Sequence, residues 1–120
     1  MQNSQTLPII FNLIAAIFGA VGQWLYKMGA GQMKTIPLYK NWPLFVGVIS
    51  FCVVMGLFVA GFRAGGKLSV TYPVYATTFL WGMLIAVQIE KETWSWIQLV
   101  GVSFIVVGVS LIAAFYPKEI

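Results

Sequence analysis

Residues 42–62 read WPLFVGVISFCVVMGLFVAGF, an apolar run without a single charged side chain. A helix that crosses the hydrocarbon core of a bilayer needs roughly 20 such residues, because each residue adds about 1.5 Å along the helix axis. Residues 42–62 therefore predict a transmembrane helix.

Three other apolar stretches are also long enough to cross a membrane, at residues 8–28, 68–89 and 94–116. Only short connections separate the four stretches. Of the 120 residues, 60% are hydrophobic and 8% are charged, so the chain lacks the polar surface of a soluble globule. We predict an all-α integral membrane protein in which residues 1–120 form one membrane domain, a bundle of four transmembrane helices.

The basic residues do not fix the orientation of the chain in the membrane. With four spans, the first and third connections lie on one side, and both termini and the second connection lie on the other. The first side carries Lys34, Lys40 and Lys91, and the second side carries Arg63, Lys67 and Lys118. Cytoplasmic loops normally hold an excess of lysine and arginine. The even count leaves open a single orientation or insertion in both orientations, as an antiparallel homodimer requires.

Small residues indicate where the helices pack, because helices in lipid associate through close backbone approach. They recur at every fourth position of the second and third spans, as Cys52, Gly56 and Ala60 and as Thr78, Gly82 and Ala86. On the fourth span, Gly101 and Gly108 are seven residues apart and so share a face. This spacing suits a dimer interface, and contacts within one chain are the alternative.

Polar side chains follow one face of the first span. Asn12, Gly19, Gln23 and Lys27 share this face with Ala16. Polar groups inside a bilayer are costly, so a functional site is the default hypothesis, and we predict that this face contributes to substrate binding. Lys27 lies near the helix end, where extension of its side chain to the interface is an alternative explanation.

The third span contains a second candidate for substrate binding, formed by Tyr72, Pro73 and Tyr75. Pro73 lacks a backbone N–H group and is expected to kink the helix. The freed carbonyl group and the two tyrosine hydroxyl groups could line a cavity. Simple packing of the tyrosines between helices is the alternative.

The chemistry of the remaining residues argues against an enzyme. There is no histidine, and the only carboxylates are Glu90, Glu92 and Glu119, none of which lies within a predicted span. We expect no cofactor, no metal and no membrane-embedded carboxylate that could exchange a proton for a cation. The scattered lysines form no stripe for nucleic acid and suit anionic lipid headgroups instead.

Basic residues near the span ends are candidates for holding a phosphate. Lys27, Arg63 and Lys67 could each attract an anionic head group at a membrane surface. A polar groove with a basic rim suits a phosphate-bearing amphiphile better than a lipophilic cation, since an ammonium group without a counter-ion would pay a large desolvation cost.

Two segments resemble the four-helix members of the drug/metabolite transporter superfamily, which include the small multidrug resistance proteins. They are AAIFGAVGQWLYKMGA at residues 15–30 and residues 68–112, with TYPVYATTFLWGMLIAV and GVSFIVVGVSLI. The resemblance implies a small multidrug resistance-like, EamA-like dimer. In the drug exporters a glutamate on the first helix carries the cation, and here that position holds Gly19, which argues against proton-coupled cation export.

The sequence is most similar to the branch of aminoarabinose-phosphoundecaprenol flippase subunits. The shared features are Gly22, Gln23 and Lys27 on the first span, Tyr72 and Pro73 on the third, the acidic connection with Glu90 and Glu92, and Gly101 and Gly108.

This resemblance implies a multi-pass transporter of the bacterial inner membrane that moves an undecaprenyl-phosphate-linked sugar or a similar anionic lipid. It would act as a homodimer or as a heterodimer with a second four-helix subunit. Two alternatives remain open: an exporter of small cations or polyamines that takes its carboxylate from a partner, and a membrane assembly subunit that transports nothing.

Overall fold

The computed structural model describes residues 5–117, and over that range the chain is helical without strands. Its elements in chain order are α1 (Thr6–Gln32), the short 3-10 helix η1 (Leu38–Lys40), α2 (Trp42–Arg63), α3 (Leu68–Tyr75), α4 (Thr78–Gln88) and α5 (Trp96–Ala114). Lys118 and Glu119 lie outside the described residues.

Four helical segments are long and apolar enough to cross a membrane: Thr6–Gln32, Trp42–Arg63, Leu68–Gln88 and Trp96–Ala114. The predicted all-α membrane protein with four spans is therefore confirmed. The last helix begins at Trp96, two residues later than predicted, because Ser95 caps it. The Ser95 hydroxyl accepts from the Gln98 N–H at 3.2 Å, and the Gln98 side chain accepts from the Ser95 N–H at 2.9 Å.

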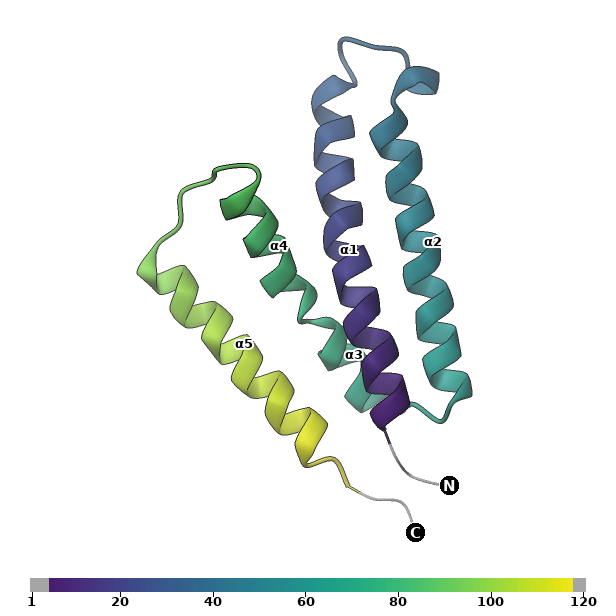
Figure 1. Ribbon diagram of the computed structural model, residues 1–120, viewed down its shortest axis with the longest axis vertical. Helices are drawn as coiled ribbons and strands as arrows, with labels where there is room; N and C mark the ends of the chain where they lie inside the picture. Colours follow the sequence, from purple (N-terminus) through teal and green to yellow (C-terminus); the bar gives the residue numbers. More distant parts are fainter. Residues whose placement is uncertain (1–4, 118–120) are drawn as a thin grey trace.

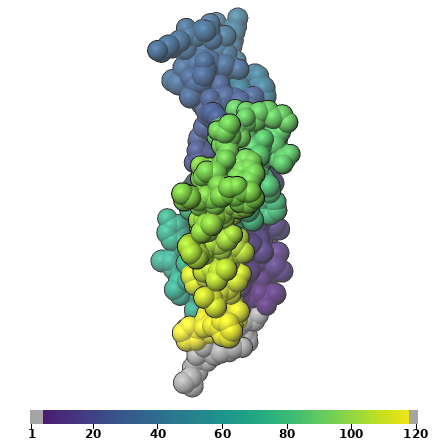
Figure 2. Space-filling model, turned by 90° about the vertical axis from the view of Figure 1, so that its left-hand side faces the viewer, coloured from purple at the N-terminus to yellow at the C-terminus, as the bar shows by residue number. Residues whose placement is uncertain are grey.

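The helices lie side by side in a flat layer that measures 57 × 36 × 16 Å between Cα atoms. Across this layer the order is α5, then α3 with α4, then α1, then α2 (Figure 1). Seen along the layer, α5 covers much of one edge (Figure 2). Helix α1 is therefore the central element, with α2 on one side and α3 and α4 on the other.

Helices α1 and α2 form a closely packed hairpin. The ring of Phe51 lies against Gly22, where an added Cβ would be only 2.6 Å from a ring carbon. Phe51 also stacks on Tyr26, with ring centroids 5.2 Å apart. The Ser50 hydroxyl donates to the Phe18 carbonyl at 2.6 Å. Small residues thus admit aromatic rings between the helices, as packing in lipid requires.

The predicted packing face of α2 is wrong within this chain. Cys52 and Gly56 are exposed, and open space surrounds the Cβ position of Gly56. The face that α2 buries instead contains Pro43, Gly47, Ser50, Val54 and Gly61. This face carries Ser50, whose hydroxyl group donates to the Phe18 carbonyl of α1. Sequence spacing alone does not distinguish this face from the stripe of Cys52, Gly56 and Ala60.

The third span is interrupted, as a proline within it led us to expect. The break falls at Ala76 and Thr77, just after Pro73 rather than at it. Here the backbone N–H of Ala76 donates to Pro73 at 2.9 Å and that of Thr77 to Val74 at 3.1 Å, the tighter i to i−3 pattern. The break divides the span into α3 and α4 and changes the direction of the chain beside α1.

Helix α5 packs far less closely than the others. It contacts α3, and none of its residues is buried. Between α4 and α5 the structure has two cavities of about 500 and 310 Å³. The layer therefore has one closely packed edge and one loosely packed edge.

Candidate functional site

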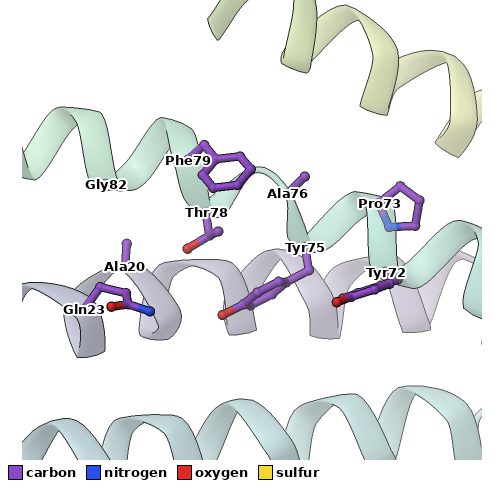
Figure 3. Close-up of a pocket in the computed structure, with 9 residues that line it drawn as sticks. All are labelled: Ala20, Gln23, Tyr72, Pro73, Tyr75, Ala76, Thr78, Phe79 and Gly82. Carbon is purple, nitrogen blue, oxygen red and sulfur yellow. The ribbon is translucent and has the colours of Figure 1, made fainter. Parts of the chain in front are cut away.

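A pocket of about 760 Å³ lies beside α1, at the break between α3 and α4. Figure 3 shows the residues that line it: Ala20, Gln23, Tyr72, Pro73, Tyr75, Ala76, Thr78, Phe79 and Gly82. Residues 72–82 fall well inside the span Leu68–Gln88, so the pocket lies at membrane depth. The structure thus brings Gln23 of the first span together with Tyr72, Pro73 and Tyr75 of the third.

The pocket has one polar side and one apolar side. The hydroxyl groups of Tyr72 and Tyr75 point along α1 toward Gln23 (Figure 3). The side chains of Pro73 and Phe79 project the other way, toward α5 (Figure 3). Such a pocket can offer hydrogen bonds to a polar group while its apolar side faces hydrocarbon.

Gly19 allows α3 and α4 to approach α1 at this point. A Cβ at Gly19 would overlap the Tyr75 hydroxyl group and would lie 3.3 Å from Thr78 Oγ1. The Thr78 hydroxyl donates to the Ala16 carbonyl at 2.8 Å, which ties the start of α4 to α1. Gly19 is not among the residues that line the pocket, and its predicted role in substrate binding stays a prediction. Its lack of a side chain sets the position of Tyr75.

A smaller cavity of about 200 Å³ lies beside this pocket, toward the end of α1. It shares Ala20, Gln23 and Gly82 with the larger pocket, and its other lining residues are Trp24, Lys27, Ile85, Ala86, Glu90 and Glu92. Two adjacent cavities therefore lie between α1 and α4, one at the tyrosines and one at the charged groups near the end of α1.

Lys27 meets both acidic residues of the connection between α4 and α5. Its ammonium group lies 2.6 Å from Glu92 Oε2 and 3.4 Å from Glu90 Oε1. The Trp24 indole N–H donates to Glu90 Oε2 at 2.9 Å. This hydrogen bond, followed by that of Lys27, lowers the pKa of Glu90 below its ordinary 4.5. The Lys27 side chain is 58% exposed, so the cluster stays within reach of water and headgroups.

Two other predicted residues lie far from Lys27. Arg63 ends α2. The Lys67 backbone N–H donates to the Gln5 side-chain oxygen at 2.8 Å, beside the start of α1. The Lys67 ammonium group donates to the Pro117 carbonyl at 2.8 Å. At a rise of about 1.5 Å per residue, roughly 33 Å of helix separates this end of α1 from Lys27. Lys27 therefore cannot hold the same phosphate as Arg63 or Lys67.

Asn12 is fully buried and lies outside the pocket. Its Nδ2 donates to the Pro8 carbonyl at 2.9 Å, and its Oδ1 has no hydrogen-bond partner among residues 5–117. Gly101 and Gly108 lie on α5 with open space at their Cβ positions. The dimer interface that we expected at these glycines stays a prediction.

Sequence reasoning did not assign three residues that line these two cavities, Thr78, Trp24 and Glu92. Thr78 was noted only as a small residue, and its hydroxyl anchors α4. Trp24 precedes Lys27 by three residues, a spacing that places both on one helix face and could have signalled a shared partner. Glu92 lies 65 positions beyond Lys27, and no local pattern predicts their contact.

Comparison with known proteins yields one informative relative. No protein-family model matches the chain, and no solved structure matches it. The probable 4-amino-4-deoxy-L-arabinose-phosphoundecaprenol flippase subunit ArnF of Proteus mirabilis (strain HI4320) is 26% identical, over 87% of this chain and 90% of the relative. The resemblance predicted from the sequence is thereby confirmed: this four-span membrane protein is similar over most of its length to an aminoarabinose-phosphoundecaprenol flippase subunit.

Proposed function

We propose that this protein is a flippase subunit that moves an undecaprenyl-phosphate-linked sugar, or a similar anionic lipid, between the leaflets of the bacterial inner membrane. The observation that carries the proposal is the pair of adjacent cavities along α1, one at Tyr72 and Tyr75 and the other at the charged group of Lys27. The relative described above supports the same class of substrate.

The two sides of the pocket suit the two parts of such a lipid. A volume of about 760 Å³ falls within the range of pockets that bind small molecules, so a sugar head group would fit. Gln23, Tyr72 and Tyr75 supply hydrogen-bonding groups for the sugar while it is removed from water. The apolar side, at Pro73 and Phe79, lets the prenyl chain stay in the membrane. Only the head group then has to cross.

The basic residues act at opposite surfaces in this mechanism. Lys27 attracts the phosphate at one surface, and Arg63 and Lys67 do so at the other, since α1 separates them by roughly 33 Å. Attraction of an anionic headgroup is worth about 1 kcal/mol per basic residue at the membrane surface. The head group would therefore bind near basic residues at each membrane surface, and no charged residue between the two surfaces would hold it tightly.

A second subunit completes the proposed transporter. None of the residues of α5 is buried. Gly101 is exposed and Gly108 is partly exposed, with open space at both Cβ positions. A second copy, or a related four-helix subunit, can pack against these glycines and enclose the apolar side of the pocket. The protein would then be a transporter subunit and not an enzyme.

The decisive experiment is transbilayer movement of a labelled undecaprenyl-phosphate sugar in proteoliposomes. Native protein is compared with Gln23→Ala and Tyr75→Phe. Gln32→Ala on the same helix and Tyr39→Phe on the exposed connection serve as matched controls outside the pocket. We expect at least a severalfold loss of rate in the two pocket variants and native rates in the controls.

Two results would contradict the proposal. Equal transport rates in the pocket variants and the controls would show that transport does not depend on the side chains of this pocket. No movement above protein-free liposomes, either for the chain alone or together with a second four-helix subunit encoded beside it, would favour a subunit that serves only assembly.

A further inference from the structure

Two hydrogen-bond donors on α1 meet the same carboxylate group. The Trp24 indole N–H donates to Glu90 Oε2 at 2.9 Å, and the Lys27 ammonium group lies 3.4 Å from Glu90 Oε1. Lys27 also holds Glu92 Oε2 at 2.6 Å. One neutral and one charged donor, three residues apart on one helix face, thus surround an oxyanion from two directions.

The oxyanions come from a tight turn that lies outside the membrane spans. The Glu90 N–H donates to the Ile85 carbonyl at 3.1 Å, and the Glu92 N–H donates to the Ala86 carbonyl at 2.9 Å. Between them Lys91 has a φ of 58°, a backbone conformation that residues with a side chain seldom adopt. The turn therefore brings both carboxylates to the cavity of about 200 Å³ that adjoins the pocket of about 760 Å³.

The charges in this arrangement oppose the binding of a phosphate. One ammonium group faces two carboxylates, so the cluster carries a net negative charge while the turn is in place. If the turn moves away, Lys27 and Trp24 present one positive charge and two free donors. Because the ion pair is exposed to solvent, separating it costs little.

We propose that Trp24 and Lys27 form an oxyanion site that the Glu90 and Glu92 carboxylates occupy at rest and vacate for the phosphate group of a lipid. The inference rests on the proposed function for the identity of the lipid, and it adds Trp24 as a binding residue and the acidic turn as a competitor. A neutral lipid cannot displace two carboxylates from an ammonium group, whereas a phosphate offers more oxygens to the same donors. The turn thereby selects anionic head groups.

Binding of undecaprenyl phosphate to the full chain in lipid nanodiscs tests the site. Trp24→Phe keeps the ring but removes the donor, and we expect affinity about tenfold lower. Lys27→Gln should lower it at least as much. Trp42→Phe and Lys40→Gln, at the same end of the molecule but outside both cavities, should bind like native protein.

Competition by the turn predicts the opposite effect for its carboxylates. Glu90→Gln with Glu92→Gln should raise the affinity about threefold. This gain should disappear when Lys27→Gln is added, because the carboxylates compete only where Lys27 is present. A gain that persists without Lys27 would reflect long-range repulsion alone and would overturn the inference, as would a loss of affinity in the double variant.

Hydrogen exchange of native protein in the same nanodiscs reports on the turn directly. We expect the amides of residues 89–93 to exchange faster when undecaprenyl phosphate is added. Unchanged or slower exchange with bound lipid would overturn the inference, and so would an absence of binding.

Transport in proteoliposomes tests the proposed function separately. If the lipid is transported but the turn of residues 89–93 stays in place, only the inference is contradicted. If the lipid binds and the turn is released but no lipid is transported, only the proposed function is contradicted.

Discussion

The α1–α2 pair and the α4–α5 pair are both helical hairpins in the same membrane layer, yet they pack very differently. Helix α2 buries five residues, and Phe51 fills the space over Gly22. Helix α5 buries none, and cavities of about 500 and 310 Å³ separate it from α4. Apolar composition is similar in α2 and α5, so hydropathy does not decide how closely a helix packs.

The difference assigns different tasks to the two halves of the molecule. The α1–α2 pair is a rigid support, because aromatic rings fit into places where glycine leaves room. The α3–α5 part holds the break in the third span, the pocket and the acidic turn. A region with few buried contacts opens at a lower free-energy cost, which is what a moving part requires.

The largest expected effect comes from filling the space between α1 and α2. Gly22→Leu would force Phe51 out of its position, and we expect the folded protein to lose about 3 kcal/mol or more, at the upper end for overpacked sites. The measurement is reversible unfolding in mixed micelles. Gly56→Leu, on the exposed face of α2 where nothing lies within 4 Å, is the matched control. Equal destabilisation by both variants would show that the contact of Phe51 with Gly22 does not make the α1–α2 pair more closely packed than the α4–α5 pair.

An intermediate effect is expected for the hydroxyl groups that tie other helices to α1. Ser50→Ala removes the bond to Phe18, and Thr78→Val removes the bond to Ala16. Each should cost about 0.6 kcal/mol and at most about 1.7 kcal/mol, as for hydrogen bonds between membrane helices. Only Thr78→Val should also slow lipid transport, because Thr78 lines the pocket. Equal slowing by Ser50→Ala would show that transport simply follows stability.

A smaller effect on the fold, but a clear one on assembly, is expected on α5. Gly101→Leu with Gly108→Leu should leave the stability of the monomer within about 0.5 kcal/mol of native, since open space surrounds both Cβ positions. The same variant should lower the dimer fraction in single-molecule photobleaching in liposomes. An unchanged dimer fraction would place the interface on another face.

The smallest expected effect concerns pH. The pKa of Glu90 is lowered, first by the Trp24 hydrogen bond and then by Lys27, so the contact is favoured above the ordinary value of 4.5 and is lost as the pH falls through the lowered pKa. The Trp24 indole N–H resonance in an NMR titration should stay constant from neutral pH to about 4.5 and shift below it. Glu90→Gln should abolish the shift. A shift near pH 7 would require a different titrating group.

The sequence predicted some of the site and missed the rest for identifiable reasons. Gln23, Tyr72, Pro73 and Tyr75 were chosen because polar groups and a proline are costly inside a membrane, a cost that applies whatever their neighbours are. All of them line one pocket. Their role in binding a substrate remains a prediction.

Other residues acquire their roles only through distant contacts. Asn12 shares a helix face with Gln23 and yet is buried away from the pocket, because 11 residues, about 16 Å of helix, separate the two. The expected face of α2 was wrong within this chain, because two faces of this helix carry small residues. The one that packs has Ser50, which reaches a carbonyl of α1.

The four spans were determined by the sequence alone, because span length and hydropathy are properties of consecutive residues. The tertiary structure alone decided which residues on different helices meet. It placed Phe51 on Gly22, opened a pocket beside α1 at the break after Pro73, and brought Glu90 and Glu92 to Lys27. These contacts join residues far apart in the chain, and they depend on the angle and offset at which α4 lies on α1, which a local pattern does not encode.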